Sequence, residues 1–308
     1  MKVFGTKRGY CLILGRRDEM NYEELIQKRQ SIRSFKEKSL KEEQLDEIRE
    51  FFDGSDRLID DIDVSLMLCA ENAGIRLEGV VGYQGYAFNA PLYLVLLSEE
   101  KEGFYENIGF IAEALSLKLT DMELDQCWLT VDSSDMVKKV LNLDTDLTIA
   151  AVIACGYGNP ELEVTRIDII TQSNVEFEKR EGHVAPKIAA SEMVFEGSFG
   201  KALVREEDQF DPYLDKALCA ASFAPSFLNL QTYRYILRDH NIVICDRQDK
   251  MVSAEDRKLS QGATMYNFYI TYSQYNNSGY KWKLGKVDNP EDLKLPKEYE
   301  AVASMRLW

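Results

Sequence analysis

The chain has 308 residues, 37 of them basic and 52 acidic, so its formal net charge is −15 and its surface would repel nucleic-acid phosphates. With 45% hydrophobic and 11% aromatic residues it is too apolar for disorder, and no uncharged apolar run approaches the roughly 18 residues of a membrane span. These values predict a soluble cytoplasmic protein that binds neither nucleic acid nor membrane, with one or two domains of about 150 residues each.

The N-terminal stretch before Met20 differs in pattern from the rest of the chain. Its apolar part, Tyr10–Leu14, is too short for the core of a secretory signal, and no small-residue cleavage site follows it. Two arginines precede Met20, and the patterning of a folded domain begins abruptly at Asn21. We therefore expect Met1–Glu19 to be a non-native extension whose arginines are a translated ribosome-binding site, and the intact mass of the native protein tests this.

The first half is predicted to mix helices and strands, from apolar spacing, capping residues and uninterrupted apolar runs. In chain order the expected elements are helix Tyr22–Gln30, helix Leu40–Phe52 capped by Ser39, strand Ile62–Leu68, strand Pro91–Leu97, helix Ile108–Leu124, a short helix through Val140 capped by Asp132 or Ser133, and strand Leu147–Cys155. The continuous apolar runs are typical of central strands that are buried on both faces.

The second half repeats this order after a polar connection predicted over Asn174–Ser198. Its expected elements are helix Pro212–Ser222, strands Thr232–Arg238 and Asn241–Cys245, helix Gln261–Tyr275 and strand Tyr299–Leu307. Gly109 and Gly262 are each followed by a helix, a tryptophan and an apolar strand, which indicates a repeat of roughly 150 residues. We therefore predict two copies of one α+β unit, over residues 20–190 and 191–308.

Cysteines and histidines give no sign of a metal or nucleophile site. The six cysteines form no C-x-x-C pair and mostly lie in apolar runs, which predicts buried free thiols in a reducing cytosol. The only histidines, His183 and His240, lie in no ligand cluster. Neither lies in a motif that would orient it for Ser-His-Asp or Cys-His chemistry.

The segment after the first predicted helix is a candidate for binding phosphate. Arg29, Ser31 and Arg33 alternate, so an extended backbone would place all three side chains on one side. Two guanidiniums and a hydroxyl suit a phosphate monoester. A solvated basic helix end, favoured by the helix dipole, explains the same residues.

Two further segments offer contacts to a ligand. In Ala224–Arg234, Pro225 restricts the backbone while Ser226 and Asn229 supply donors and acceptors that suit a planar heterocycle; an ordinary helix–strand connection is the alternative. In Gln126–Thr130, which follows the long helix, backbone amides suit a ligand, or its tryptophan is simply a core residue.

Together these segments resemble the FMN-dependent nitroreductase family. The R-x-S-x-R-x-F element, the A-P-S-x-x-N-x-Q element and a C-W-L segment followed by a strand ending in G-Y all occur within Met20–Trp308. Ordinary members are shorter, carry both elements in one subunit and form two FMN sites in a homodimer. Here each element occurs in only one half, so the chain resembles the double-length TM nitroreductases, a fused pseudo-dimer that would be a monomer with one complete FMN site.

The resemblance also implies the site residues. The first element would hold the flavin phosphate and the polar edge of the ring, the C-W-L segment would approach N5 and O4, and the second half would line the flavin. The implied FMN-binding residues are Arg29, Ser31, Arg33, Gln84, Trp128, Leu129, Thr130, Pro225, Ser226, Phe227 and Asn229. The family often adds a basic residue late in the unit, for which Lys179, Arg180 and Lys187 are candidates without a matching pattern.

The implied activity is ping-pong hydride transfer from NAD(P)H through FMN to a nitroaromatic, a quinone or a similar acceptor. The flavin carries this chemistry, so no acid–base residue is required. Gln126 and Val131 stand where the family commonly has glycines, and Thr232 stands where it has a proline. These departures keep open an alternative, an FMN-binding protein for sensing or storage with little turnover.

Overall fold

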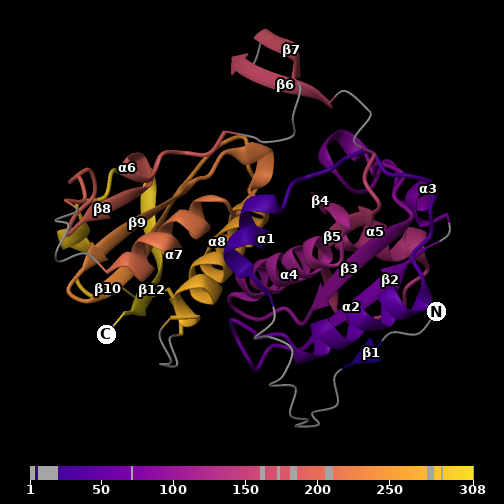
Figure 1. Cartoon of the computed structure of the whole chain (residues 1–308), viewed down its shortest axis with the longest axis horizontal. Coiled ribbons are helices and arrows are strands. Elements are labelled where there is room, and N and C mark those ends of the chain that lie inside the picture. The colour runs from indigo at the N-terminus through magenta and orange to yellow at the C-terminus, as the bar shows by residue number, and fades with distance from the viewer. Residues whose placement is uncertain are drawn as a thin grey trace.

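The structure is a computed structural model that describes residues 4–5, 20–70, 72–159, 164–171, 174–180, 186–204, 211–275, 281–285 and 287–307. Two five-stranded sheets lie on opposite sides of a central pair of long helices, α4 (Phe104–Asp121) and α8 (Ala254–Ser273) (Figure 1). The helix α4 packs on the first sheet and α8 on the second, and the two helices pack against each other.

The first sheet is antiparallel throughout and has the strand order β1-β2-β3-β5-β4. Its strands are β1 (Phe4–Gly5), β2 (Val64–Cys69), β3 (Leu92–Ser98), β4 (Asp125–Leu129) and β5 (Thr148–Gly156). Helices α2 (Glu42–Gly54) and α4 cover one face, and α3 (Ala73–Leu77) and α5 (Ser134–Leu141) cover the other. Because both faces are covered, every residue of β3 and β5 is buried, as their uninterrupted apolar runs predict.

The second sheet has the order β11-β12-β10-β9-β8. Read in reverse, as β8-β9-β10-β12-β11, it follows the same pattern as the first sheet: the first three strands are neighbours in chain order, and the last two are exchanged. Its strands are β8 (Val194–Glu196), β9 (Tyr233–Arg238), β10 (Asn241–Arg247), β11 (Lys283–Leu284) and β12 (Tyr299–Arg306). Helices α7 (Pro212–Ser222) and α8 pack on one face, while a small cluster around Leu293 of η4 (Pro290–Leu293) covers the other. The strand β8 pairs with β9 in parallel, unlike β1 with β2.

The central helices cross at two glycines. A Cβ atom on Gly109 would lie 2.1 Å from the backbone oxygen of Leu259, and one on Gly262 would lie 2.1 Å from that of Glu106. Only glycine allows this approach, so the residues that mark the sequence repeat are those at which the two helices touch. The interpretation of the halves as two copies of one unit stays a prediction.

The first helix connects the two halves. In α1 (Tyr22–Lys28), Asn21 caps the N-terminus by accepting from the N–H of Glu24, as the sequence predicts. Its apolar side chains are buried in the same cluster as Leu214 of α7 and Tyr235 of β9, which belong to the second half. This packing carries the end of α1, and therefore Arg29, to the boundary between the halves.

Most predicted elements are confirmed, but several boundaries were wrong. The prediction of α7 is confirmed at both ends, since the helix spans Pro212–Ser222. At its start Asp211 caps the helix and Pro212 occupies the first turn. The predicted cap Ser39 is wrong: α2 begins at Glu42, and Gln44 accepts from the N–H of Lys41. Both long helices begin earlier than predicted, since their first turns carry polar residues that the apolar pattern omits.

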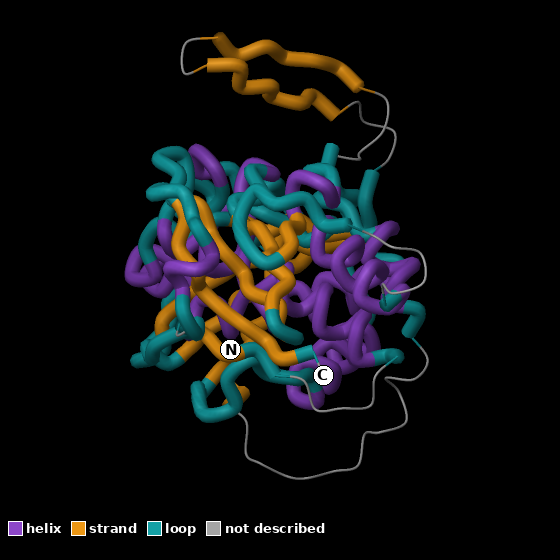
Figure 2. Tube along the Cα trace, turned by 90° about the vertical axis from the view of Figure 1, so that its left-hand side faces the viewer, coloured by secondary structure: helices purple, strands orange, loops and turns teal. Residues whose placement is uncertain are grey.

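Two segments that were not predicted as strands contain them. The C-W-L segment lies in β4, and the stretch predicted as a polar connection contains β7 (Asn174–Arg180), α6 (Ala190–Met193) and β8. The strand β7 pairs with β6 (Val164–Thr171) in a hairpin that stands apart from the body (Figures 1 and 2). Polar composition misled the prediction, because a hairpin whose apolar residues alternate with polar ones does not need a continuous apolar run.

The thiol and metal predictions are tested only in part. Among the described cysteines, Cys69, Cys127, Cys155 and Cys245 are buried free thiols, whereas Cys219 is exposed. The described residues contain no metal-binding group of His, Cys, Asp or Glu, and none of their helices is long and apolar enough to cross a membrane. Cys11, His183 and all but Phe4–Gly5 of the predicted extension lie outside the described residues.

Candidate functional site

The R-x-S-x-R segment runs along the edge of the first sheet. Ser31 forms a parallel bridge with Gln126 of β4, and the N–H of Ile32 donates to the carbonyl of Gln126 at 2.9 Å. Further along, Phe35 pairs with Gly158. The segment therefore pairs like a strand at these two residues, which is the backbone form that the binding interpretation requires, and it lies beside the C-W-L segment although almost a hundred residues separate the two.

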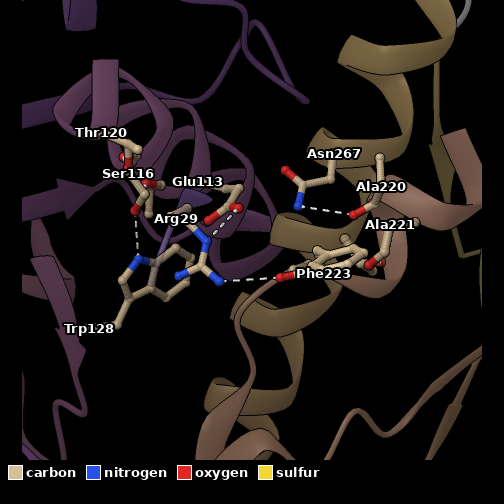
Figure 3. A network of polar contacts seen from close by, with 12 residues as sticks. Arg29, Glu113, Ser116, Thr120, Trp128, Ala220, Ala221, Phe223 and Asn267 are labelled. Atoms are coloured by element: carbon tan, nitrogen blue, oxygen red, sulfur yellow. Dashed lines mark hydrogen bonds and ion pairs between the residues drawn. The ribbon is translucent and has the colours of Figure 1, made fainter. Parts of the chain in front are cut away.

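The two guanidiniums of this segment lie in different surroundings. Arg29 is 8% exposed, its Nε lies 3.4 Å from the carboxylate of Glu113 on α4, and its Nη2 donates to the carbonyl of Phe223 at 3.2 Å (Figure 3). Arg33 is exposed and lies 5.9 Å from the ring of Phe88. Arg29 is thus held at the boundary between the halves. That both arginines bind one phosphate stays a prediction.

The A-P-S-x-x-N loop follows α7 and is braced by its own side chains. The hydroxyl of Ser226 accepts from the N–H of Gln231 at 3.1 Å, and the side chain of Gln231 donates to the carbonyl of Ser222 at 2.9 Å. Pro225 is buried, and Phe227 and Asn229 belong to the short η3 (Phe227–Asn229), where Leu228 and Asn229 have positive φ. Hydrogen bonds within the chain therefore fix the shape of the loop.

One basic residue that the sequence left unassigned is part of this loop. The ammonium of Lys187 donates to the carbonyl of Ala224 at 2.9 Å and to Oδ1 of Asn229 at 3.1 Å. The amide of Asn229 donates in turn to the carbonyl of Pro186 at 2.7 Å. No local motif marks Lys187, and the only signal in the sequence is a positive charge late in the first unit.

A turn of the first half meets the loop of the second half. The rings of Tyr83 and Phe227 lie 6.0 Å apart at 70°. In the same turn, η2 (Tyr83–Gly85), Gln84 is exposed with a φ of 56°, and the N–H of Gly82 donates to the carbonyl of Thr130 at 2.8 Å. Gln84, Thr130 and Phe227 are thus brought together from three separate stretches of sequence.

Trp128 and Leu129 contribute mainly packing with their side chains. The indole N–H of Trp128 donates to the hydroxyl of Ser116 on α4 at 2.8 Å (Figure 3). Leu129 is buried in the cluster between the first sheet and α5. These contacts support the core interpretation for the side chains, so any contact of this segment with a ligand would come from its backbone.

The boundary holds an unusual set of buried charges. Glu113 is fully buried, and burial raises the pKa of its carboxyl from 4.5 to about 7, against the lowering effect of Arg29. Burial and the charge of Arg29 lower the pKa of Lys187 to about 8. The amide of Asn267 lies close enough to lower the pKa of Glu113, but it donates to the carbonyl of Ala220 at 3.3 Å.

The polar atoms at this boundary fit a bound anion. Among the described residues, Nε and Nη1 of Arg29 and both polar side-chain atoms of Gln126 are buried without a hydrogen-bond partner. An unsatisfied buried polar group costs about 1–3 kcal/mol, and native proteins rarely tolerate one without a ligand or a water. These atoms lie on the extended segment and on the strand with which it pairs. A phosphate there would accept from the guanidinium of Arg29 and from Nε2 of Gln126, whereas Oε1 of Gln126 needs a donor.

Comparison with known proteins gives the family and the fold of the chain. A family model described as "Putative TM nitroreductase" matches residues 21–271 of the chain. The fold is similar to the crystal structure of a putative nitroreductase from Thermotoga maritima, with a TM-score of 0.57 and 16% identity over 97% of this chain and 99% of that one. At that identity the likeness shows a shared fold over the whole length.

Other solved structures match about half of the chain. They include an FMN-dependent nitroreductase from Clostridium difficile (TM-score 0.39, 18% identity, 44% of this chain and 86% of that one). A putative NADH oxidase from Clostridium acetobutylicum is comparable (TM-score 0.39, 21% identity, 51% of this chain and 99% of that one). No curated protein matches. Because the family model spans most of the chain, the protein belongs to the nitroreductase family of the TM type.

Proposed function

We propose that the protein is an FMN-dependent oxidoreductase that takes hydride from NAD(P)H and passes it to a nitroaromatic, a quinone or a similar acceptor. The observation that carries the proposal is the meeting of the two family elements at one boundary. Arg29 of the first element donates to Phe223, which lies directly before the A-P-S-x-x-N loop of the second half. Neither half contains both elements, so the site needs the whole chain.

Each element has a role in this proposal. Arg29, Ser31 and Arg33 would hold the phosphate and the polar edge of FMN, with charge-assisted hydrogen bonds from the guanidiniums. The loop from Pro225 to Asn229 would line the flavin from the second half, and Lys187, already bonded to Asn229, would add a second buried cation. When bound, FMN would supply the hydride chemistry.

The strand β4 would contribute through its backbone. The side chain of Trp128 is occupied by its bond to Ser116, and that of Leu129 by packing. A backbone N–H directed at the flavin N5 and O4 edge would stabilise negative charge there, which is the usual role of a pre-placed donor. This role requires no catalytic acid or base among the side chains.

We also propose that the chain is a fused pseudo-dimer with one FMN and that it acts as a monomer. The common strand order of the two sheets and the glycine crossing of α4 and α8 support this proposal. The helix α1 packs into the core of the other half, as an element exchanged between two subunits would.

The purified protein tests the function directly. It should be yellow or should take up FMN at one per chain, and NAD(P)H should bleach the flavin band under anaerobic conditions. A protein that stays colourless after incubation with FMN refutes the proposal. A protein that binds FMN but is not bleached points to the second candidate.

The second candidate is an FMN-binding protein with little turnover. It is favoured by Gln126, which replaces a common glycine in β4 and is fully buried, with its carbonyl occupied by Ile32. A bulky side chain there alters how closely the strand approaches the flavin. NAD(P)H oxidation by the FMN-loaded protein with several acceptors separates the two candidates.

A further inference from the structure

We propose that Glu113 is a positioning residue of the anion site: it holds Arg29 in the ligand-free protein and takes up a proton when an anion binds to Arg29. The inference rests on the proposed function, because the anion is taken to be the phosphate of FMN. It adds a residue that no sequence motif marks and a proton that the protein takes from the solvent when the anion binds.

The geometry joins Glu113 to both halves through one guanidinium. Glu113 lies on α4, Arg29 ends α1, and the carbonyl of Phe223 that accepts from Arg29 ends α7 (Figure 3). The ion pair with Arg29 spans 3.4 Å, but neither carboxylate oxygen has a well-formed hydrogen bond among the described residues. A buried carboxylate kept only for stability would need such bonds, so this one is poorly stabilised in its charged form.

The other groups that face Glu113 do not replace Arg29. The titratable and charged groups that act on it are Arg29 from the end of α1, Lys187 from the segment before α6, and Tyr233 from β9, with the amide of Asn267 from α8. The ammonium of Lys187 is directed to Ala224 and Asn229. Arg29 is therefore the partner for which Glu113 and an incoming phosphate compete.

This competition makes binding take up a proton. Two negative groups around one buried guanidinium leave excess negative charge in a poorly solvated place, and like charges raise the pKa of a carboxyl. The pKa of Glu113 is already about 7 without a ligand, so the proton is readily gained near neutral pH. Once it is neutral, Glu113 no longer competes with the phosphate for the ion pair with Arg29.

Calorimetry of FMN binding to the FMN-free protein measures that proton. The titration is run at pH 8 in two buffers of different ionisation enthalpy, because the phosphate of FMN (pKa about 6) is then already a dianion. Wild type should take up close to one proton per FMN. The Glu113→Gln variant should still bind FMN but take up at least half a proton less.

Three controls make the result specific. Glu106→Gln removes a carboxyl two turns earlier on α4, whose pKa burial also raises, and it should leave the proton count at the wild-type value. Lys187→Arg keeps a permanent charge, so uptake that survives in this variant does not come from Lys187. Riboflavin, which lacks the phosphate, should bind without uptake.

The outcomes separate this inference from the proposed function. If wild type binds FMN with the same proton count as Glu113→Gln, the inference is overturned and the function stands. If wild type binds no FMN at any pH, both are overturned. Should the Glu113→Gln variant fail to fold, the Kd of the Lys187→Arg variant decides: it should rise severalfold from pH 7 to pH 8.5, and a constant Kd overturns the inference.

Discussion

Replacing Glu113 by glutamine should make the FMN-free protein more stable at pH 8. The side chain is fully buried on α4 beside Arg29, and burial raises its pKa from 4.5 to about 7. Each pKa unit corresponds to about 1.4 kcal/mol, so ionised Glu113 costs the folded protein on the order of 3 kcal/mol relative to the unfolded chain. Glutamine has the shape of the neutral acid and does not carry this cost.

The direction of the stability change follows from the protonation of Glu113 in the folded and unfolded states. Below about pH 4.5 Glu113 is neutral in both states, so the variant and wild type should be about equally stable. Between that value and about pH 7 only the unfolded chain loses the proton, and wild type loses stability as the pH rises. Above pH 7 both states are ionised, and the advantage of the variant stays constant.

Urea unfolding of the two proteins at pH 5 and pH 8 measures this difference. The free energy of unfolding of Glu113→Gln minus that of wild type should be small at pH 5 and reach about 3 kcal/mol at pH 8. Glu291→Gln on η4, where the carboxyl is exposed, is the matched control and should show no such change. A variant that is less stable than wild type at pH 8 would refute the reasoning, because the ion pair with Arg29 would then stabilise the fold.

Three further changes test the site and the packing. Arg33→Ala should weaken FMN roughly 10- to 100-fold in a fluorescence titration, since a charge-assisted bond contributes about 1.5–3 kcal/mol; Arg49→Ala on α2 should not, and equal affinities would argue against the site. Gly109→Ala should lower the Tm by several degrees, because its Cβ would lie 2.1 Å from the backbone of Leu259; an unchanged Tm would show that α4 and α8 separate freely. Trp128→Phe should cost about 1 kcal/mol in urea unfolding by losing the bond to Ser116 and leave FMN affinity unchanged; a large loss of affinity would give the indole a direct role.

The parts of the fold that follow from local pattern were predictable. The runs that form β3 and β5 are almost entirely apolar and of strand length, which is typical of a strand covered on both faces. The helix α7 has Asp211 as its N-cap and Pro212 in its first turn, so these two residues are enough to predict where it begins. The extended path of Ser31 likewise follows from a short alternating segment.

The arrangement of the site was less predictable because its contacts are distant in sequence. Arg29 bonds to a carbonyl 194 residues away, and Lys187 bonds to an asparagine 42 residues away. Alternation predicts which side of a strand a residue occupies, but not that a carboxylate on another helix turns one arginine inward. For the same reason Glu113 went unnoticed: within α4 it is one polar residue in a buried helix.

The two halves differ at the position that creates the charge cluster. Glu113 lies four residues after the crossing glycine of α4, and Tyr266 lies four residues after the crossing glycine of α8. Tyr266 is buried and packs edge-on against Phe110, with ring centroids 4.9 Å apart. In the proposed duplication, Tyr266 takes in the second half the position at which the first half carries the carboxylate for Arg29. The second half therefore has no carboxylate at the position of Glu113, and we expect FMN to bind at one per chain.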